Sequence, residues 1–146
     1  MTSGRQQILG EVEGISVATR FSPDGRSVVL SVTRNGGSDL YVVDLASGSR
    51  RQITSSGAID TSPCFSPDGS QIVFNSDRGG SPQIYIMPAS GGGARRISYG
   101  QGTYGSPVWS PRGDLIAFTR IAGGMFSLGV MAPDGTGERI MTQGFT

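Results

Sequence analysis

The pentapeptide FSPDG occupies residues 21–25 and returns at residues 65–69, and its variant WSPRG occupies residues 109–113. Each copy begins 44 residues after the one before it. A constant period of this size is typical of repeat proteins, in which each copy is one supersecondary unit that packs on its neighbours. The pentapeptide therefore sets the register in which the chain can be compared with itself.

The rest of the chain follows the same 44-residue period without insertion or deletion. Apolar segments start in register at Asp39 (DLYVVDL), Gln83 (QIYIMPA) and Ser127 (SLGVMAP). We therefore interpret residues 1–146 as one domain of tandem units. The predicted units are residues 15–55, 59–99 and 103–143, preceded by an extra outer strand at residues 5–10.

Each unit is predicted to contain four short strands, as the second copy illustrates. DTSPCF (60–65) leads into a Ser-Pro-Asp-Gly turn, where proline presets φ and glycine accepts a positive φ, and QIVFNS (71–76) follows. The third strand, at 84–87, is apolar at every position, which favours a strand covered on both faces. The Arg-bearing fourth strand, at 95–99, suits an exposed sheet edge, because charge there discourages unwanted pairing.

Four antiparallel strands per unit, repeated in series, indicate an all-β fold, the β-propeller, with three blades in this chain. The 24 glycines and 8 prolines agree with this class, since both residues supply turn geometries. A solenoid of stacked sheets is the alternative. We expect the aromatic residue of each motif to pack between neighbouring blades and the other residues to form a hairpin turn. The motif residues are Phe21, Pro23, Asp24 and Gly25, then Phe65, Pro67, Asp68 and Gly69, then Trp109, Pro111 and Gly113.

Composition argues against several classes of protein. The net charge is +1, and the basic residues are spread through the repeats, so nucleic acid is not an expected partner. No apolar run approaches the ~20 residues of a membrane-spanning helix, so we expect no membrane insertion. The first ten residues, MTSGRQQILG, lack the apolar core of a signal peptide. The single cysteine, Cys64, excludes an internal disulfide.

The sequence offers no catalytic constellation. It contains no histidine, which removes the usual general base and the commonest metal ligand. It has no Gly-x-Ser-x-Gly nucleophile elbow. Asp24, Asp68 and Asp134 stand in Pro-Asp-Gly turns, where capping of the turn is the simplest role for the carboxylate. We therefore expect no enzymatic activity, no cofactor and no bound metal.

The stretch DTSPCFSPDGSQIVFNSDRGGSPQIY, at residues 60–85, resembles the propeller repeat of the TolB family, and the similarity extends over nearly the whole chain. The resemblance implies a periplasmic parent protein of the Tol–Pal system, with an N-terminal α/β domain and a six-bladed propeller that binds the lipoprotein Pal. This chain is similar to the middle of such a propeller, so we expect it to be an excerpt of a longer one. A related repeat occurs in the propellers of prolyl-oligopeptidase-type peptidases, which leaves a peptidase cap as an alternative.

In a propeller, the linkers between blades share one face with the loops between the second and third strands. Residues at these positions differ among the three units, and the TolB resemblance implies that Pal docks there. Tyr104 is the preferred anchor, because aromatic residues are enriched at interface hot spots, and a contact between blades is its alternative role. For Asp60, a role in capping a loop or lining the channel is an equal alternative. The candidate partner-binding residues are Ser16, Asp60, Thr61, Asp77, Arg78, Thr103 and Tyr104.

One arginine recurs in each predicted outer strand, at Arg51, Arg95 and Arg139. Strands at the rim of three different blades lie far apart, so these side chains are not expected to form a common anion site. We interpret them as solvated edge residues.

Two functions from different classes remain. One is a non-catalytic protein-binding segment with the family's role in Pal recognition and envelope integrity. The other is a self-assembling structural fragment that has kept no partner. Three blades in an open arc leave two apolar faces bare, and closed propellers have about 4–8 blades. Because six is the only multiple of three in that range, we expect two chains to close one homodimeric ring.

Overall fold

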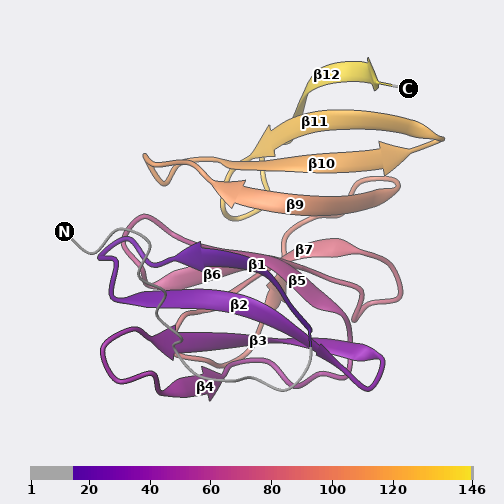
Figure 1. Ribbon diagram of the computed structural model, residues 1–146. Helices are drawn as coiled ribbons and strands as arrows, with labels where there is room; N and C mark the ends of the chain where they lie inside the picture. The colour runs from indigo at the N-terminus through magenta and orange to yellow at the C-terminus, as the bar shows by residue number, and fades with distance from the viewer. Residues whose placement is uncertain (1–14, 146) are drawn as a thin grey trace.

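The computed structural model describes the backbone of residues 15–145 and the side chains of residues 19–142. Twelve strands form three separate four-stranded antiparallel sheets, one for each repeat (Figure 1). The expected outer strand at residues 5–10 lies outside the described residues. Within the described part of the chain, no helix is long and apolar enough to cross a membrane.

Each sheet is a meander whose strands pair with their neighbours in sequence, and we refer to the sheets as blades 1 to 3. Blade 1 comprises β1 (Ile15–Phe21), β2 (Ser27–Arg34), β3 (Gly37–Asp44) and β4 (Arg50–Gln52). Blade 2 comprises β5 (Asp60–Phe65), β6 (Gln71–Ser76), β7 (Gln83–Pro88) and β8 (Arg95–Arg96). Blade 3 comprises β9 (Thr103–Trp109), β10 (Ile116–Ala122), β11 (Met125–Met131) and β12 (Arg139–Phe145).

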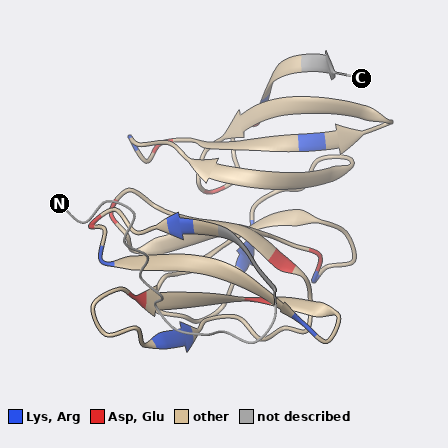
Figure 2. Cartoon of the chain, in the orientation of Figure 1, with Lys and Arg blue, Asp and Glu red and all other residues tan. Residues whose placement is uncertain are grey.

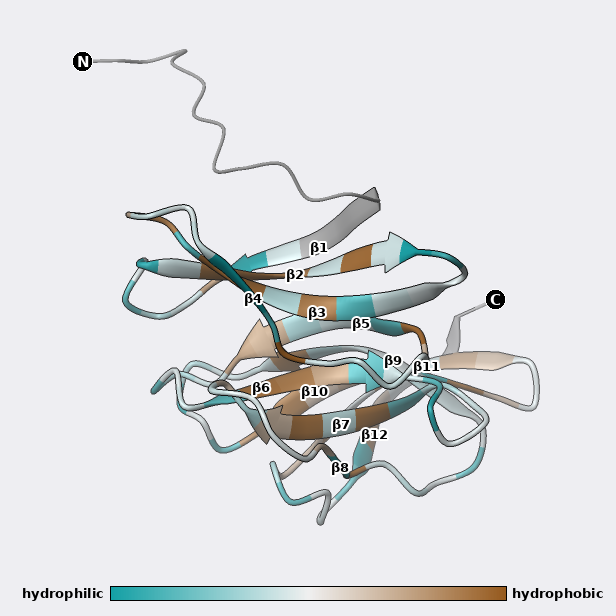
Figure 3. Cartoon of the chain, turned by 90° about the horizontal axis from the view of Figure 1, so that it is seen from below, coloured by the Kyte–Doolittle hydropathy of each residue, from teal (hydrophilic) through white to brown (hydrophobic). Residues whose placement is uncertain are grey.

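The blades meet through their first strands, since β1 contacts β5 and β5 contacts β9. The sheets therefore stand face to face around a common inner edge, which is the arrangement of a β-propeller and not that of a solenoid. Figure 3 shows apolar segments on β6, β7 and β10 in the region where sheets face one another. Charged residues are scattered over the three blades without a stripe of one sign (Figure 2). The prediction of an all-β fold with four-stranded blades is confirmed.

The Ser-Pro-Asp-Gly segments form the turns between the first and second strands. Gly25, Gly69 and Gly113 have φ angles of 71°, 76° and 81°, a conformation that glycine adopts without steric cost. In the second copy, Asp68 Oδ1 accepts hydrogen bonds from the Ser70 amide at 3.0 Å and the Ser66 hydroxyl at 2.7 Å. These donors lower the pKa of Asp68 to about 2. The aspartate therefore caps its turn, as the sequence predicted.

Apolar clusters join the blades. Burying one such Leu, Ile or Phe side chain stabilises the fold by ~1.5–3 kcal/mol, so each joint is a substantial part of the core. Between blades 1 and 2 the buried side chains are Val29, Leu40 and Ile53 on one side and Phe65, Ile72, Phe74, Tyr85 and Met87 on the other. Between blades 2 and 3 they are Val73, Ile84, Ile86 and Ile97 against Tyr104, Trp109, Ile116, Phe118 and Met131.

Phe21 departs from the prediction that every motif aromatic packs between blades. Phe65 and Trp109 are 9% and 7% exposed, but Phe21 is 69% exposed. The physical reason is its position in blade 1, because no described blade stands on that side. A third buried cluster lies within blade 1 and contains Val28, Leu30, Val32, Tyr41 and Val43.

The first strand of each blade carries a bulge. Pairing of β5 with β6 shifts register between Thr61 and Cys64, and the other two blades show the corresponding shift. At the bulges of blades 2 and 3, Ser62 and Ser106 have φ angles of 53° and 48°, in the left-handed region. A bulge re-aims the residues that follow it, so the inner edge of each blade bends away from a regular ladder.

Candidate partner-binding face

Two opposite faces can be distinguished by the connections that they carry. We call the face with the hairpins between second and third strands, together with the linkers between blades, the linker face. Backbone hydrogen bonds hold these connections to one another, from the Ser38 amide to the Ala58 carbonyl at 3.1 Å and from the Tyr104 amide to the Pro82 carbonyl at 3.0 Å. The Ser-Pro-Asp-Gly turns lie on the opposite face, which we call the turn face.

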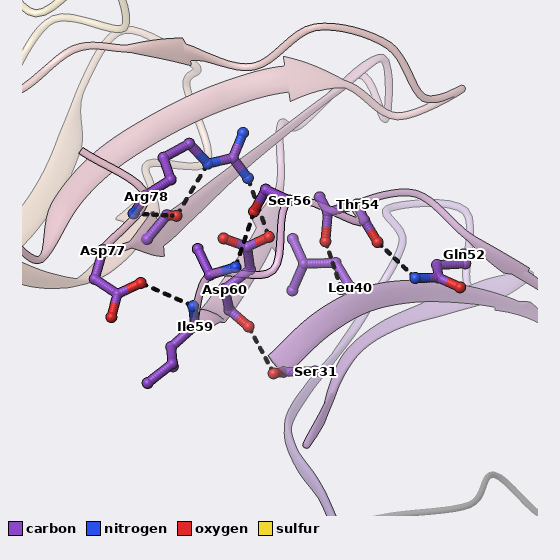
Figure 4. A network of polar contacts seen from close by, with 11 residues as sticks. Ser31, Leu40, Gln52, Thr54, Ser56, Ile59, Asp60, Asp77 and Arg78 are labelled. Carbon is purple, nitrogen blue, oxygen red and sulfur yellow. Dashed lines mark hydrogen bonds and ion pairs between the residues drawn. The ribbon is translucent and has the colours of Figure 1, made fainter. Parts of the chain in front are cut away.

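A charged clamp stands where the linker face crosses from blade 1 to blade 2 (Figure 4). Arg78 Nη2 lies 3.0 Å from Asp60 Oδ2, and the Asp60 side chain is fully buried. The guanidinium also lies over the rings of Phe74 and Tyr85, at 5.2 and 5.0 Å from their centroids. Blade 1 reaches the same point, because Ser31 Oγ donates to the Asp60 carbonyl oxygen at 2.7 Å. The clamp therefore ties a surface arginine to the buried joint.

The neighbouring aspartates have different environments. Asp77 Oδ1 accepts a hydrogen bond from the Ile59 amide at 2.8 Å, so it orders the linker ahead of β5. Asp39, on β3, has one buried carboxylate oxygen without a hydrogen-bond partner among the described residues, as has Asp60. Burial, and then repulsion from Asp60, raise the pKa of Asp39. Asp39 therefore binds a proton more readily than an ordinary aspartate.

A second clamp lies within blade 3, at its joint with blade 2. The Tyr104 hydroxyl donates to Glu138 Oε1 at 2.7 Å, and Arg120 Nη1 donates to Glu138 Oε2 at 3.1 Å. Across the joint, Asn75 Nδ2 donates to the Tyr104 carbonyl at 2.5 Å. Burial, followed by the hydrogen bond to Glu138, raises the pKa of Tyr104 to about 12. The phenol is thus held neutral inside the joint.

These positions change the interpretation of two predicted site residues. Tyr104 is 2% exposed and Asp60 is fully buried, so neither side chain is available as a surface anchor. Tyr104 belongs to a contact between blades, the alternative that the sequence left open for it. Asp60 is paired with Arg78, whereas the alternatives considered for it were capping a loop and lining the channel. Thr61 and Thr103 are half-buried on the linker face. Asp77 and Arg78 are half-buried too, whereas the side chain of Ser16 lies outside the described side chains.

Two large side chains on this face are exposed, and neither was among the candidate partner-binding residues. Tyr99, in the linker after β8, is 72% exposed, and Ile59, in the linker before β5, is 47% exposed. The Arg96 guanidinium lies 4.9 Å from the Tyr99 ring centroid, and the Tyr99 hydroxyl donates to the Arg96 carbonyl at 3.0 Å. A signal was present, because Tyr99 stands where the first unit has Ser55, so an aromatic residue has been gained in a linker.

Arg51 is exposed at the rim, but its side chain also makes contacts that the sequence did not predict. Its Nη1 donates to the Ser90 carbonyl at 2.5 Å and its Nη2 to the Ala89 carbonyl at 3.2 Å, both on the next blade. Arg95 lies near enough to Asp134, the counterpart of Ser90, to contribute to its lowered pKa, behind the hydrogen bonds from Thr136. The rim arginine is therefore a contact between successive blades. The sequence did not reveal this because the repeat alone does not show how far a side chain reaches.

The described residues provide no evident metal centre, since no three His, Cys, Asp or Glu side chains among them gather in a suitable group. Asp24, Asp68 and Asp134 accept hydrogen bonds in their turns. What this face offers is a set of exposed aromatic and apolar side chains on linkers, supported from behind by buried clamps.

Comparison with known proteins identifies the family to which this fold belongs. The family model of the TolB beta propeller domain matches residues 1–146. The Tol-Pal system protein TolB of Gluconobacter oxydans (strain 621H) is 81% identical over 56 residues, which are 38% of this chain and 12% of that protein. The crystal structure of TolB from Acinetobacter baumannii matches 97% of this chain and 36% of its own, with a TM-score of 0.86 and 29% identity.

The chain thus spans about a third of the Acinetobacter protein, and its match covers a smaller part of the Gluconobacter one. A structure from an analysis of two prolyl endopeptidases shares the fold alone, with a TM-score of 0.73 at 16% identity. Since the family model covers every residue and the repeat, turns and blades agree with it, the chain belongs to the TolB beta propeller domain family.

Proposed function

We propose that this chain is a non-catalytic protein-binding propeller segment and that its linker face receives the partner. The relative from Gluconobacter oxydans is named a Tol-Pal system protein, which supports a partner from that system. By the TolB resemblance, the partner is the lipoprotein Pal and the compartment is the periplasm. The role would be recognition of Pal in maintaining the cell envelope.

The observation that carries this proposal is the pair of exposed anchors on a rigid support. Tyr99 and Ile59 are large side chains that the fold leaves in solvent, while the linkers that hold them are fixed by hydrogen bonds to the Arg96 carbonyl and to the Asp77 carboxylate. Aromatic residues lose little conformational entropy on binding and dominate interface energetics. Because their positions are set before the partner arrives, less free energy is needed to order them.

The half-buried polar residues around the anchors form the rest of the proposed contact surface. Thr61, Asp77, Arg78 and Thr103 supply hydrogen-bonding groups of the kind that surround an interface core. Ser16, the counterpart of Asp60 and Tyr104 in the first unit, is not assigned to this surface, because its side chain lies outside the described side chains. Asp60 and Tyr104 would act from behind, by holding the linkers in place and not by touching the partner.

The test is a calorimetric titration of this chain with the soluble domain of Pal from Gluconobacter oxydans. Tyr99→Ala and Ile59→Ala should each weaken binding about tenfold or more, which corresponds to ~1.4 kcal/mol. The matched control is Arg112→Ala, an exposed residue of the turn face with a side chain that is 88% exposed.

Binding with a defined stoichiometry that only the linker-face variants weaken would support the proposal. An intact fold that shows no heat of binding would leave the structural-fragment function. If Arg112→Ala weakened partner binding as much as the linker-face variants do, the partner would contact the turn face as well, which would contradict the proposal.

A further inference from the structure

A groove opens on the turn face between blades 1 and 2, and we refer to it as the first groove. It has a volume of about 680 Å³, and the first two Ser-Pro-Asp-Gly turns line it from opposite sides. Small-molecule sites in proteins have volumes of ~300–1,000 Å³, so the first groove is of that size. Both of its walls belong to described blades of the same chain, so its shape does not depend on what adjoins blade 1 or blade 3 from outside.

Two contacts span the first groove and fix its walls relative to each other. Arg51, on β4, donates to the Ala89 and Ser90 carbonyls of blade 2, at 3.2 and 2.5 Å. Between the two turns, a Cβ placed at Gly69 would lie 3.6 Å from Pro23, so the turns approach each other closely there. Because the fold already holds these walls in place, a ligand needs little free energy to order the site.

The equivalent groove between blades 2 and 3, the second groove, is much smaller. Its volume is about 250 Å³. Three residues that line the first groove have larger counterparts 44 residues later along the chain. The larger residues are Gln71, Ile86 and Trp109, where the first groove has Ser27, Val42 and Phe65. The smaller side chains between blades 1 and 2 therefore leave space that the next joint fills.

Two carboxylates line the first groove, one from each turn. The capping hydrogen bonds go to Oδ1 in both cases, from the Ser22 hydroxyl to Asp24 at 2.7 Å and from the Ser70 amide to Asp68 at 3.0 Å. These bonds lower the pKa of Asp24, and they lower the pKa of Asp68 to about 2, so both groups are charged at neutral pH. Among residues 19–142, Oδ2 of each aspartate accepts no hydrogen bond. Each turn therefore presents one carboxylate oxygen that the turn itself does not use.

The charges differ between the two grooves. In the third motif Arg112 stands where the first two have aspartate, so the second groove pairs Asp68 with a cation. Arg51 also lines the first groove, but its guanidinium donates to carbonyl oxygens and forms no ion pair with either aspartate. The remaining lining includes apolar side chains, namely Pro23, Val42, Phe65 and Pro67. The first groove thus combines an apolar surface with two negative charges that have no cationic partner among the described residues.

We propose that the first groove binds an aliphatic diamine, the class of small molecule that includes the polyamines. One ammonium group donates to Oδ2 of Asp24 and the other to Oδ2 of Asp68, since an ammonium offers three N–H donors and a carboxylate only accepts. The methylene chain between them lies against the apolar lining, where it leaves water. A metal ion suits the groove less well, because Ca²⁺ takes 6–8 oxygen ligands and would leave the apolar lining exposed. The inference concerns the turn face and does not depend on which protein binds the linker face.

The first experiment is an NMR titration of the isotope-labelled 146-residue chain with diaminoalkanes of three to eight carbons. We expect saturable shifts at the amides of Asp24, Asp68 and Ala89, and none in the linkers between blades. The affinity should pass through a maximum at the chain length that spans the two carboxylates. A monoamine of that length should bind about tenfold more weakly or worse, and the uncharged diol should not bind.

Variants then test the two carboxylates without removing the turns. Asp24→Asn and Asp68→Asn each remove a charge and keep an oxygen that can cap the turn, so the fold should be unchanged. Each should raise the dissociation constant of the best diamine about tenfold or more. The matched control is Asp134→Asn, which changes the capping aspartate of a turn outside the groove and should leave binding unchanged. Ser27→Gln, which introduces the side chain found in the second groove, should also weaken binding by filling the space.

Three results would each overturn the proposal: shifts that do not saturate by about 10 mM diamine, an affinity that does not depend on chain length, or an equal loss of binding in Asp134→Asn. The last two would show a diffuse attraction of cations to the surface. Displacement of the diamine by an equal concentration of Ca²⁺ would show that a metal ion is the preferred ligand and would overturn it as well.

Discussion

Removing Arg78 should destabilise this protein much more than neutralising its partner Asp60. Arg78→Met leaves the Asp60 carboxylate fully buried without its cation, whereas Asp60→Asn leaves a guanidinium whose side chain is 22% exposed and can recruit water. The arginine also keeps a bond from Nε to the Ser76 hydroxyl at 3.0 Å, together with its place over two aromatic rings. The ion pair is therefore asymmetric in the consequences of breaking it.

The magnitudes follow from burial. An uncompensated buried charge costs about 3–5 kcal/mol when its partner is removed, which is the case for Arg78→Met. The loss of a hydrogen bond with a charged partner costs about 1.5–3 kcal/mol, which is the upper limit for Asp60→Asn because Arg78 can rehydrate. For a chain of this size, Arg78→Met should lower the melting temperature by roughly 6–20 °C. The double variant should recover part of the loss, with a coupling free energy of about 1–3 kcal/mol.

The assay is guanidinium unfolding at pH 7, followed by circular dichroism, for the wild type, both single variants and the double variant. The control is Arg112→Met, which removes an arginine from the turn face. Equal and small losses for both single variants would refute the reasoning, since they would show that Asp60 is solvated in the native state.

Four further expectations can be measured on the same material. Gly69→Val should lower the melting temperature without changing partner binding, because φ at this turn is 76° and the new side chain meets Pro23; an unchanged melting temperature would contradict it. Gly129→Ala should destabilise by about 1–3 kcal/mol in chemical unfolding, since its Cβ would lie 2.6 Å from the Phe118 ring. Because the pKa of Tyr104 is about 12 in the fold and 10.0 ordinarily, the unfolded chain loses this proton first. The associated stability is complete below pH 10 and is lost between pH 10 and 12, and Tyr104→Phe should remove that slope from unfolding curves at pH 9 and 11. Peptide and ester substrates should not be turned over, and turnover abolished by one side-chain substitution would show otherwise.

The repeat made much of the architecture predictable from the sequence. The strands DTSPCF and QIVFNS have the predicted bounds, and the turn glycines have the positive φ that the motif required. These features are local, because a turn or a short strand is specified by the residues that form it. The same reasoning identified the capping role of Asp68.

Features that depend on a neighbouring blade could not be predicted in the same way. Asp60 and Tyr104 were distinguished by their variation between copies, yet both are buried because the preceding blade covers the start of β5 and β9. The repeat pattern gives the position of a residue within its own blade. Whether its side chain is buried depends on the side chains of the neighbouring blade that pack against it. Tyr99 was overlooked for the converse reason, since its exposure comes from the path of a linker outside the strand pattern.

The bulges on the first strands have a consequence for aggregation. β1, β5 and β9 are the inner edge strands of their sheets, and an open edge can pair with a strand of another chain. In β5, Ser62 has a positive φ and is followed by Pro63; in β9, Ser106 has a positive φ and is followed by Pro107. Proline has no amide proton to donate. The kink and the missing donor interrupt the edge at the point where an invading strand would seek its next hydrogen bond. The inner edges of these two blades are therefore protected against the addition of further strands, as occurs in amyloid growth.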